Sequence, residues 1–161
     1  MAIRNRAVIM YLSGDKKAVY SATSRLCDKW GIPYSTVLEG GLWVKKDAIA
    51  GLGNGDKVYI VGHGSQTSLG GDTPNGVAMC LKRAGLKSGV IVSLVSCNTG
   101  TTSNSFAHRL RAELKDTFGL ECQVVGRKGV ATVAKSGTVF TKTNLGWRSD
   151  KAVSKLYVGT R

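Results

Sequence analysis

The chain has 161 residues, of which 42% are hydrophobic and 20% are charged, a composition that suits one globular domain and excludes an intrinsically disordered protein. It has 23 Lys and Arg residues against 10 Asp and Glu residues, which gives a formal net charge of +13. This charge favours an anionic partner such as nucleic acid, an anionic membrane face or a polyphosphate. A basic protein without such a partner is the alternative, because no run of Lys and Arg exceeds two residues.

Strand and helix patterns alternate from the N-terminus onward. The apolar run over 7–12 is too short for a transmembrane span or for a secretory signal with its cleavage site, and it predicts the first core strand. Asp15 is expected to cap the following helix, and Gly31 to end it. In order, the first part of the chain predicts a strand over 6–12, a helix over 16–30, a strand over 34–44 broken at Gly40 and Gly41, and a short helix over 46–52.

Two later apolar runs are each followed by a chemically reactive residue. The run over 57–61 has the continuous, β-branched pattern of a parallel strand covered on both faces, and His63 comes two residues after it. The run over 90–95 has the same character, and Cys97 comes two residues after it. Each reactive residue is therefore predicted just beyond the end of a buried strand.

Helix signals lie between these strands, and short polar strands follow them. Thr73 and Pro74 predict the start of a helix that runs to about residue 86, because proline suits the first helical position. Ser103 or Asn104 is expected to cap a further helix that ends at Gly119. The remaining strands are expected over 121–126, 130–133, 138–143 and 156–158.

This alternation predicts a parallel α/β sandwich with right-handed crossovers. We expect one domain over 1–161, with an α/β core over 1–126 and a small antiparallel β appendage over 127–161. Sites in such sheets lie at the carboxyl ends of the strands, where both His63 and Cys97 fall. An imidazole beside a thiol is what a cysteine nucleophile and its proton acceptor require.

Each of these two residues also has a structural interpretation when it is taken alone. His63 could be a turn histidine at a strand end, and Cys97 could be a buried structural thiol. Cys27, Cys80 and Cys122 lie among apolar residues, which predicts reduced, buried thiols and a cytoplasmic setting. The sequence has no CxxC motif and no close Cys/His pair, so no metal site is expected.

The two blocks resemble the signature of clan CD cysteine peptidases, the caspase-like superfamily. That signature is a hydrophobic block followed by His-Gly and then a second block followed by Ala/Ser/Gly-Cys; residues 59–64 and 92–100 match both. The second block is similar to bacterial CHAT-type caspase-like domains, and the first to the autoprocessing cysteine protease domains of large bacterial toxins. The resemblance implies a caspase-like three-layer sandwich and a cysteine endopeptidase that works through a thioester acyl-enzyme. It assigns Cys97 as nucleophile, His63 as general acid/base, and the backbone N–H groups of Gly64 and Cys97 as the oxyanion hole.

The chain departs from this pattern at three points, the first of which is that the region after residue 126 does not supply the family's substrate-pocket segments in a recognisable form. His63 and Cys97 are 34 positions apart, which is short for the superfamily. No acidic residue adjoins His63; Asp72 could reach it through the loop, or a backbone carbonyl could orient it. Ser96 is interpreted as a small residue that packs beside the nucleophile. The alternatives are a non-protease hydrolase with the same dyad, or a catalytically inactive caspase-like module that binds nucleic acid, an inositol phosphate or a partner protein.

The expected partners are a protein or peptide substrate and an anionic activator. Few acidic residues lie near the motifs, so an aliphatic or acidic side chain before the scissile bond is favoured over Arg or Lys.

Toxin-type relatives are activated by inositol hexakisphosphate on a basic surface beside a β-flap, and the resemblance extends such a polyanionic activator to this chain; no other cofactor is expected. A solvated basic face is the alternative. The chain is expected in the cytoplasm or as an exported bacterial effector or toxin domain. The candidate anion-binding residues lie in the appendage: Arg127, Lys128, Lys135, Lys142, Arg148 and Lys151.

Overall fold

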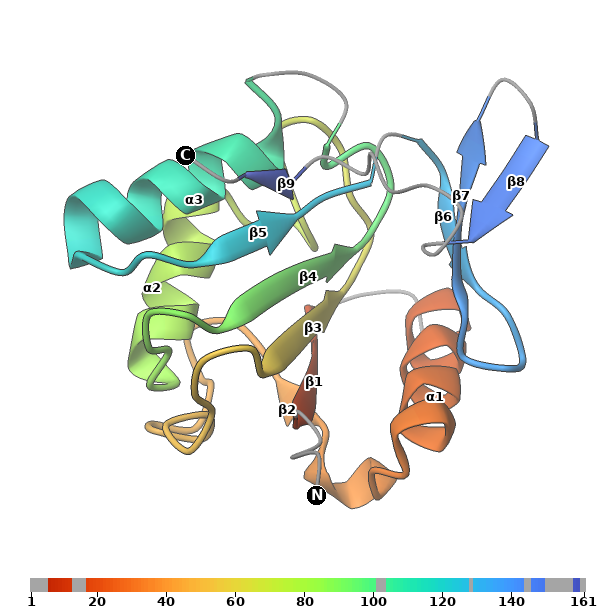
Figure 1. Ribbon diagram of the computed structural model, residues 1–161, viewed down its shortest axis with the longest axis horizontal. Helices are drawn as coiled ribbons and strands as arrows, with labels where there is room; N and C mark the ends of the chain where they lie inside the picture. Colours follow the sequence, from red (N-terminus) through yellow and green to blue (C-terminus); the bar gives the residue numbers. More distant parts are fainter. Residues whose placement is uncertain are drawn as a thin grey trace.

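The computed structural model describes residues 6–12, 17–100, 104–127, 129–143, 146–149 and 158–159. Figure 1 shows a central sheet with helices on both of its faces. The sheet has the strand order β2-β1-β3-β4-β5-β9, in which the first five strands run parallel and β9 is antiparallel to β5. This confirms the predicted α/β sandwich with a mostly parallel sheet. The strands are β1 (Ala7–Tyr11), β2 (Leu38–Glu39), β3 (Lys57–Val61), β4 (Ile91–Val95), β5 (Gln123–Val125) and β9 (Val158–Gly159).

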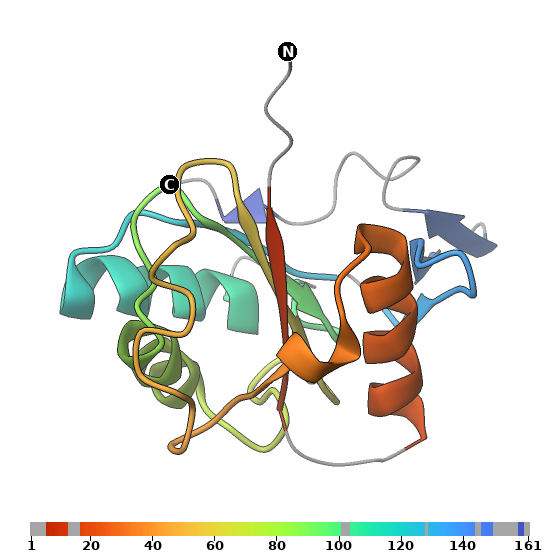
Figure 2. The same ribbon diagram turned by 90° about the horizontal axis from the view of Figure 1, so that it is seen from below.

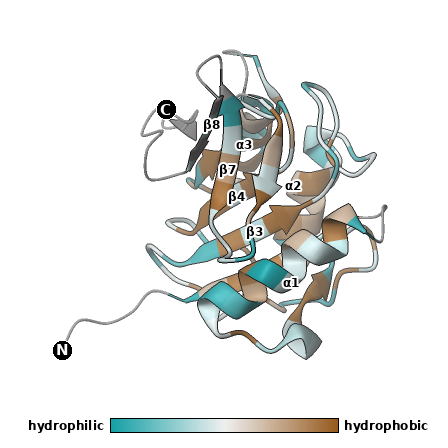
Figure 3. Ribbon diagram, turned by 90° about the vertical axis from the view of Figure 1, so that its right-hand side faces the viewer, coloured by the Kyte–Doolittle hydropathy of each residue, from teal (hydrophilic) through white to brown (hydrophobic). Residues whose placement is uncertain are grey.

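Helices cover both faces of the sheet (Figures 1 and 2). Helix α1 (Ala18–Trp30) lies on one face, and α2 (Pro74–Arg83) and α3 (Phe106–Phe118) lie on the other. Successive residues of each strand point to opposite faces. In β3, Val58 and Ile60 therefore join the core under α2 and α3, whereas Tyr59 and Val61 join the core under α1. Figure 3 shows β3 as a mostly hydrophobic strand, as burial on both of its faces requires.

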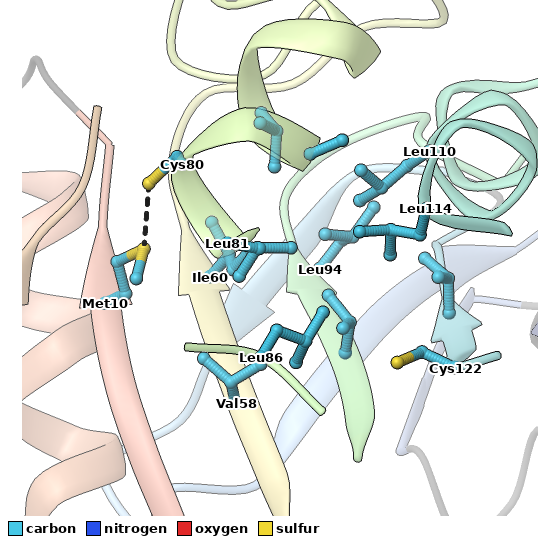
Figure 4. Close-up of a cluster of buried hydrophobic side chains, with 14 of the residues drawn as sticks. Met10, Val58, Ile60, Cys80, Leu81, Leu86, Leu94, Leu110, Leu114 and Cys122 are labelled. Carbon is cyan, nitrogen blue, oxygen red and sulfur yellow. Dashed lines mark hydrogen bonds between the residues drawn. The ribbon is translucent and has the colours of Figure 1, made fainter. Parts of the chain in front are cut away.

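The larger core lies between the sheet and the helix pair α2 and α3. Figure 4 shows Leu81 of α2 and Leu110 and Leu114 of α3 directed toward Leu94 of β4. All four side chains are completely buried. Full burial of a leucine stabilises the folded state by about 1.5–3 kcal/mol, so this layer fixes β4, and with it the segment that carries Cys97.

The ends of the helices follow the predicted signals closely. The Thr73 hydroxyl accepts a hydrogen bond from the Gly76 N–H at 3.1 Å, and Pro74 occupies the first turn of α2. Gly31 and Gly119 end α1 and α3 in the left-handed conformation, with φ of +64° and +67°. Helix α2 ends at Arg83 rather than near residue 86, since Gly85 adopts a φ of +92°.

The predicted cap of α3 is corrected by the structure, whereas the predicted cap of α1 lies outside the described residues. The N-cap residue, which directly precedes α3, is Ser105, and it adopts the extended conformation typical of this position. Asn104 comes one residue earlier, and Ser103 lies outside the described residues. The proposed cap of α1, Asp15, also lies outside them.

The segment over 34–52 differs most from the prediction. The expected strand over 34–44 is a short 3-10 turn at Tyr34–Thr36 followed by the two residues of β2. The strand ends before Gly40, where a Cβ atom would lie only 2.5 Å from Leu12. The expected helix over 46–52 is a series of turns, because Asp47 has a positive φ of +59° that interrupts helical geometry.

The appendage is a separate antiparallel sheet in the order β6-β7-β8, formed by β6 (Ala131–Val133), β7 (Val139–Thr143) and β8 (Gly146–Ser149). Val133 and Val139 pack with Val19 and Leu26 of α1, so the appendage extends the α1 layer. The strand expected over 156–158 was wrongly assigned to the appendage, because β9 pairs with β5 of the main sheet. In the described part of the chain, no helix has the length and apolar character that crossing a membrane requires.

Candidate active site

His63 and Cys97 lie side by side in the fold because β3 and β4 are neighbouring parallel strands. Their register ends with Val61 opposite Val95, and the Gly62 N–H donates to the Val95 carbonyl at 3.4 Å. His63 and Cys97 each follow these paired valines by two residues, and both line one cavity of about 420 Å³. The structure therefore brings the predicted imidazole and thiol to the same edge of the sheet.

Gly64 is the residue that lets the two loops approach one another. A Cβ atom at this position would lie 2.6 Å from the Cys97 carbonyl oxygen and 2.8 Å from Ser96 Cβ. Both distances are too short for a side chain, so only glycine fits. Ser96 is buried, and its hydroxyl finds no hydrogen-bond partner among the described residues. Its small size beside Gly64 agrees with the predicted packing role.

The backbone around Cys97 is held by the segment that leads into β6. The Asn98 N–H donates to the Gly129 carbonyl at 3.0 Å, and Asn98 itself has a φ of +57°. The Gly100 N–H donates to the Arg127 carbonyl at 2.8 Å. The Ala131 N–H lies 3.4 Å from the Cys97 sulfur and donates a hydrogen bond to it. Such a donor stabilises a thiolate more than a thiol.

Cys97 is the accessible member of the four cysteines, all of which are free. Burial raises the pKa of the thiols of Cys27, Cys80 and Cys122, the last of them to about 11. Protonated, buried thiols are poor nucleophiles. Cys97 is only half-buried, and His63 is exposed at the mouth of the cavity.

One wall of the cavity comes from α1, a contribution that the sequence interpretation missed. Ala18 and Ala22 present small side chains to the cavity, and Lys17, Ser21 and Arg25 add polar groups. The Arg25 guanidinium donates to the Val133 carbonyl of β6 at 2.6 Å and so joins α1 to the opposite wall. The spacing of positions 18, 22 and 25 on one helical face was the available signal.

Asp72, the predicted support for His63, lies close to the start of α2. Its backbone exchanges hydrogen bonds with Leu69, at 2.9 and 3.0 Å. Its carboxylate contributes to the raised pKa of Cys80, after the larger effect of burial. A role in orienting the imidazole of His63 stays a prediction.

Three of the predicted anion-binding residues have described side chains, and one of these three does not lie on the surface. Arg127 was wrongly placed in this set, because its side chain is fully buried and donates to the Ser93 hydroxyl at 3.2 Å. Lys135 and Lys142 are exposed on the appendage, as expected. The side chain of Arg148 and the whole of Lys128 and Lys151 lie outside the described part of the chain.

Comparison with known proteins agrees with this geometry. The model of the Peptidase C80 family matches residues 3–142, a range that contains both strand ends and extends into β7. This is a family of clan CD cysteine peptidases associated with toxin autoprocessing, which confirms the resemblance drawn from the two motifs. No curated protein matches the chain.

The close approach at Gly64 predicts a specific cost for adding a methyl group there. Gly64→Ala should lower the free energy of unfolding by about 1–3 kcal/mol, because the loops that carry His63 and Cys97 must separate. Gly53→Ala is the matched control, since a Cβ atom there meets nothing within 4 Å, and it should change stability by less than about 0.5 kcal/mol. Urea unfolding measures both. Equal stability of the two variants would contradict the contact.

Proposed function

We propose that this chain, which belongs to the Peptidase C80 family of cysteine peptidases, cleaves peptide bonds with Cys97 as nucleophile and His63 as general acid/base. The observation that carries the proposal is the cavity that these two residues share at the ends of register-paired strands. A nucleophile and a base must both reach one carbonyl group, and a shared cavity provides that access.

In the proposed reaction, His63 accepts the thiol proton of Cys97 while the sulfur attacks the carbonyl carbon of the scissile bond. The tetrahedral intermediate collapses when His63 returns the proton to the departing amine, which leaves a thioester on Cys97. Water then attacks the thioester with His63 as base, which releases the new carboxylic acid and restores the thiol. The hydrogen bond from the Ala131 N–H to the Cys97 sulfur supports the thiolate in the first step.

The backbone N–H groups of Gly64 and Cys97 are the proposed oxyanion hole. The close contact between Gly64 and the Cys97 carbonyl supports this role, because it brings the backbones of the two residues together at one end of the cavity. A single donor of this type commonly contributes about 3–4 kcal/mol to lowering the barrier. Asp72 is retained as a proposed positioning residue for His63, and Ser96 as the small neighbour that keeps the two loops in contact.

The cavity supports an aliphatic residue before the scissile bond. Its apolar lining includes Val19, Val61, Val95 and Val133, and a cavity of about 420 Å³ accommodates a branched side chain. Arg25 supports the second preference, an acidic residue, because its guanidinium lies on the same lining. The four free thiols support a reducing compartment, either the cytoplasm or the interior of a cell that receives an exported effector.

A polyanionic activator remains part of the proposal in a reduced form. Its binding residues are Lys135 and Lys142 on the appendage, without the buried Arg127. Lys142 lies on β7, which pairs with β6, and Ala131 of β6 donates a hydrogen bond to the Cys97 sulfur. An anion bound at Lys142 is therefore separated from the Cys97 sulfur by one strand. An inorganic polyphosphate shares this chemistry with an inositol phosphate.

Thiol labelling tests the catalytic pair directly. Iodoacetamide should alkylate Cys97 before the three buried cysteines, and His63→Ala should slow this reaction by about a hundredfold or more, because the base no longer assists loss of the proton. Mass spectrometry locates the label. His108→Ala is the control, since this second histidine lies on α3 and does not line the cavity. A labelling rate that is the same with and without His63 would favour an inactive binding module.

Cleavage of a peptide library tests the proposed specificity. The wild type should cut after aliphatic residues, and Cys97→Ala should be inactive. Ala22→Leu narrows the cavity and should shift the preference toward alanine, whereas Ala112→Leu on the exposed part of α3 should not. Arg25→Gln should abolish any cleavage after Asp or Glu. Preferred cleavage after Lys or Arg would contradict the assignment of the cavity.

A thermal-shift titration tests the activator. Inositol hexakisphosphate at low ionic strength should raise Tm by about 5 °C or more once it exceeds its Kd about a hundredfold. Lys135→Glu combined with Lys142→Glu should remove the shift, while Lys82→Glu combined with Lys87→Glu, which makes the same change in net charge outside the appendage, should retain it. The absence of any shift for the wild type at low salt would reject the activator.

A further inference from the structure

An exposed apolar turn follows β2 and takes no part in the candidate active site. Leu42 is 76% exposed and Trp43 is 92% exposed, although the next residue, Val44, is completely buried. Neither residue of this turn lines the active-site cavity. Two adjacent large apolar side chains that project into water are unusual and typically mark an interaction site.

The exposure is built into the structure, because hydrogen bonds fix the chain on both sides of the turn. The Gly41 N–H donates to the Cys80 sulfur at 3.2 Å, and the Arg83 Nε donates to the Val44 carbonyl at 2.9 Å. Further along, the Asp47 N–H donates to the Arg83 carbonyl at 3.0 Å. These bonds to α2 hold the backbone on both sides of Leu42 and Trp43, so the position of the turn on the surface is fixed.

Basic side chains follow this turn in the chain and line the neighbouring cavity. Lys45 and Lys46 follow it directly, and an open cavity of about 790 Å³ beside it is lined by Lys46, Lys82, Arg83 and Lys87, with Met79, Leu86 and Phe118 as its apolar part. In the described part of the chain, none of the five cations forms an ion pair with a carboxylate. The nearby acids are Asp47, and Glu113, which already accepts hydrogen bonds from Asn75 and Thr117.

We propose that this face docks on an anionic lipid surface, with Leu42 and Trp43 inserted at the level of the headgroups. Tryptophan is favoured at that level because its ring is amphipathic, and neighbouring Lys and Arg side chains contact the anionic headgroups. Leu42 and Trp43 are strongly exposed and line none of the described cavities, and a bilayer accommodates such exposed apolar side chains without a preformed pocket. An acidic protein would instead need a pocket for Trp43, so the lipid surface is the occupant that the geometry favours. The inference does not depend on the proposed peptidase activity.

Vesicle binding tests the proposal at about 0.15 M ionic strength, where long-range charge effects are screened. The full chain should co-sediment with phosphatidylcholine vesicles that contain phosphatidylserine, and much less with phosphatidylcholine alone. Leu42→Ser with Trp43→Ser should weaken binding about tenfold or more, because burial of the two side chains is lost. Trp147→Ser, which removes another exposed tryptophan, should leave binding unchanged.

Charge reversal separates this face from the general basicity of the chain. Lys45→Glu with Lys46→Glu should weaken vesicle binding about tenfold or more, since each cation near an anionic surface contributes about fivefold in affinity. Lys135→Glu with Lys142→Glu makes the same change in net charge on the appendage and should cause a much smaller loss. Equal losses from the two pairs would mean unspecific attraction and would overturn the proposal.

The wavelength of tryptophan emission reports insertion of Trp43 into the bilayer, which electrostatic attraction alone does not cause. Emission should shift to the blue on addition of anionic vesicles, and the shift should disappear in Trp43→Phe but persist in Trp147→Phe. A shift that persists in Trp43→Phe would contradict insertion of the turn. Binding to soluble poly-glutamate that depends on Trp43, without binding to vesicles, would assign the face to an acidic protein and overturn the lipid proposal.

Discussion

The candidate active site depends on the in-register pairing of β3 with β4. The pairing ends with Val61 opposite Val95, so His63 and Cys97 leave the sheet at the same level on neighbouring strands. A slip of one residue would displace one of them by about 3.3 Å and would turn alternate side chains toward the other face of the sheet. Gly64 then adds the second constraint, because only a residue without a Cβ atom allows the His63 loop to lie against the Cys97 carbonyl.

Much of the cavity is supplied by segments far from these two motifs in the sequence. Helix α1 provides one wall and β6 another, and the bond from Arg25 to the Val133 carbonyl links them. The Ala131 N–H also reaches the Cys97 sulfur. The small appendage sheet is thus part of the site rather than an addition at its edge. A shift of β6 would therefore change both the shape of the cavity and the surroundings of the Cys97 thiol.

The sequence predicted the features that local patterns determine and missed those that depend on tertiary packing. Buried parallel strands have continuous apolar runs, so β3, β4 and the positions of His63 and Cys97 could be found from the chain alone. The segment over 34–44 has β-branched and aromatic residues, yet only Leu38–Glu39 forms a strand, and Gly40 next to it packs closely against Leu12. The two residues of β9 pair with a strand more than thirty positions earlier, which no local signal could indicate.

The burial of Arg127 changes how the net charge of the chain is interpreted. The charge of +13 is not one basic field on the surface, because this guanidinium lies inside the protein and donates to Ser93. Charges that face water act over only about 8 Å at physiological ionic strength, so their local arrangement decides which anion they attract. The exposed Lys142 of the appendage lies on β7, whereas Lys45 and Lys46 lie in the loop before β3. Figure 1 shows that β7 and this loop are on different parts of the fold. They are therefore two separate electrostatic features, and the total charge is not evidence for either.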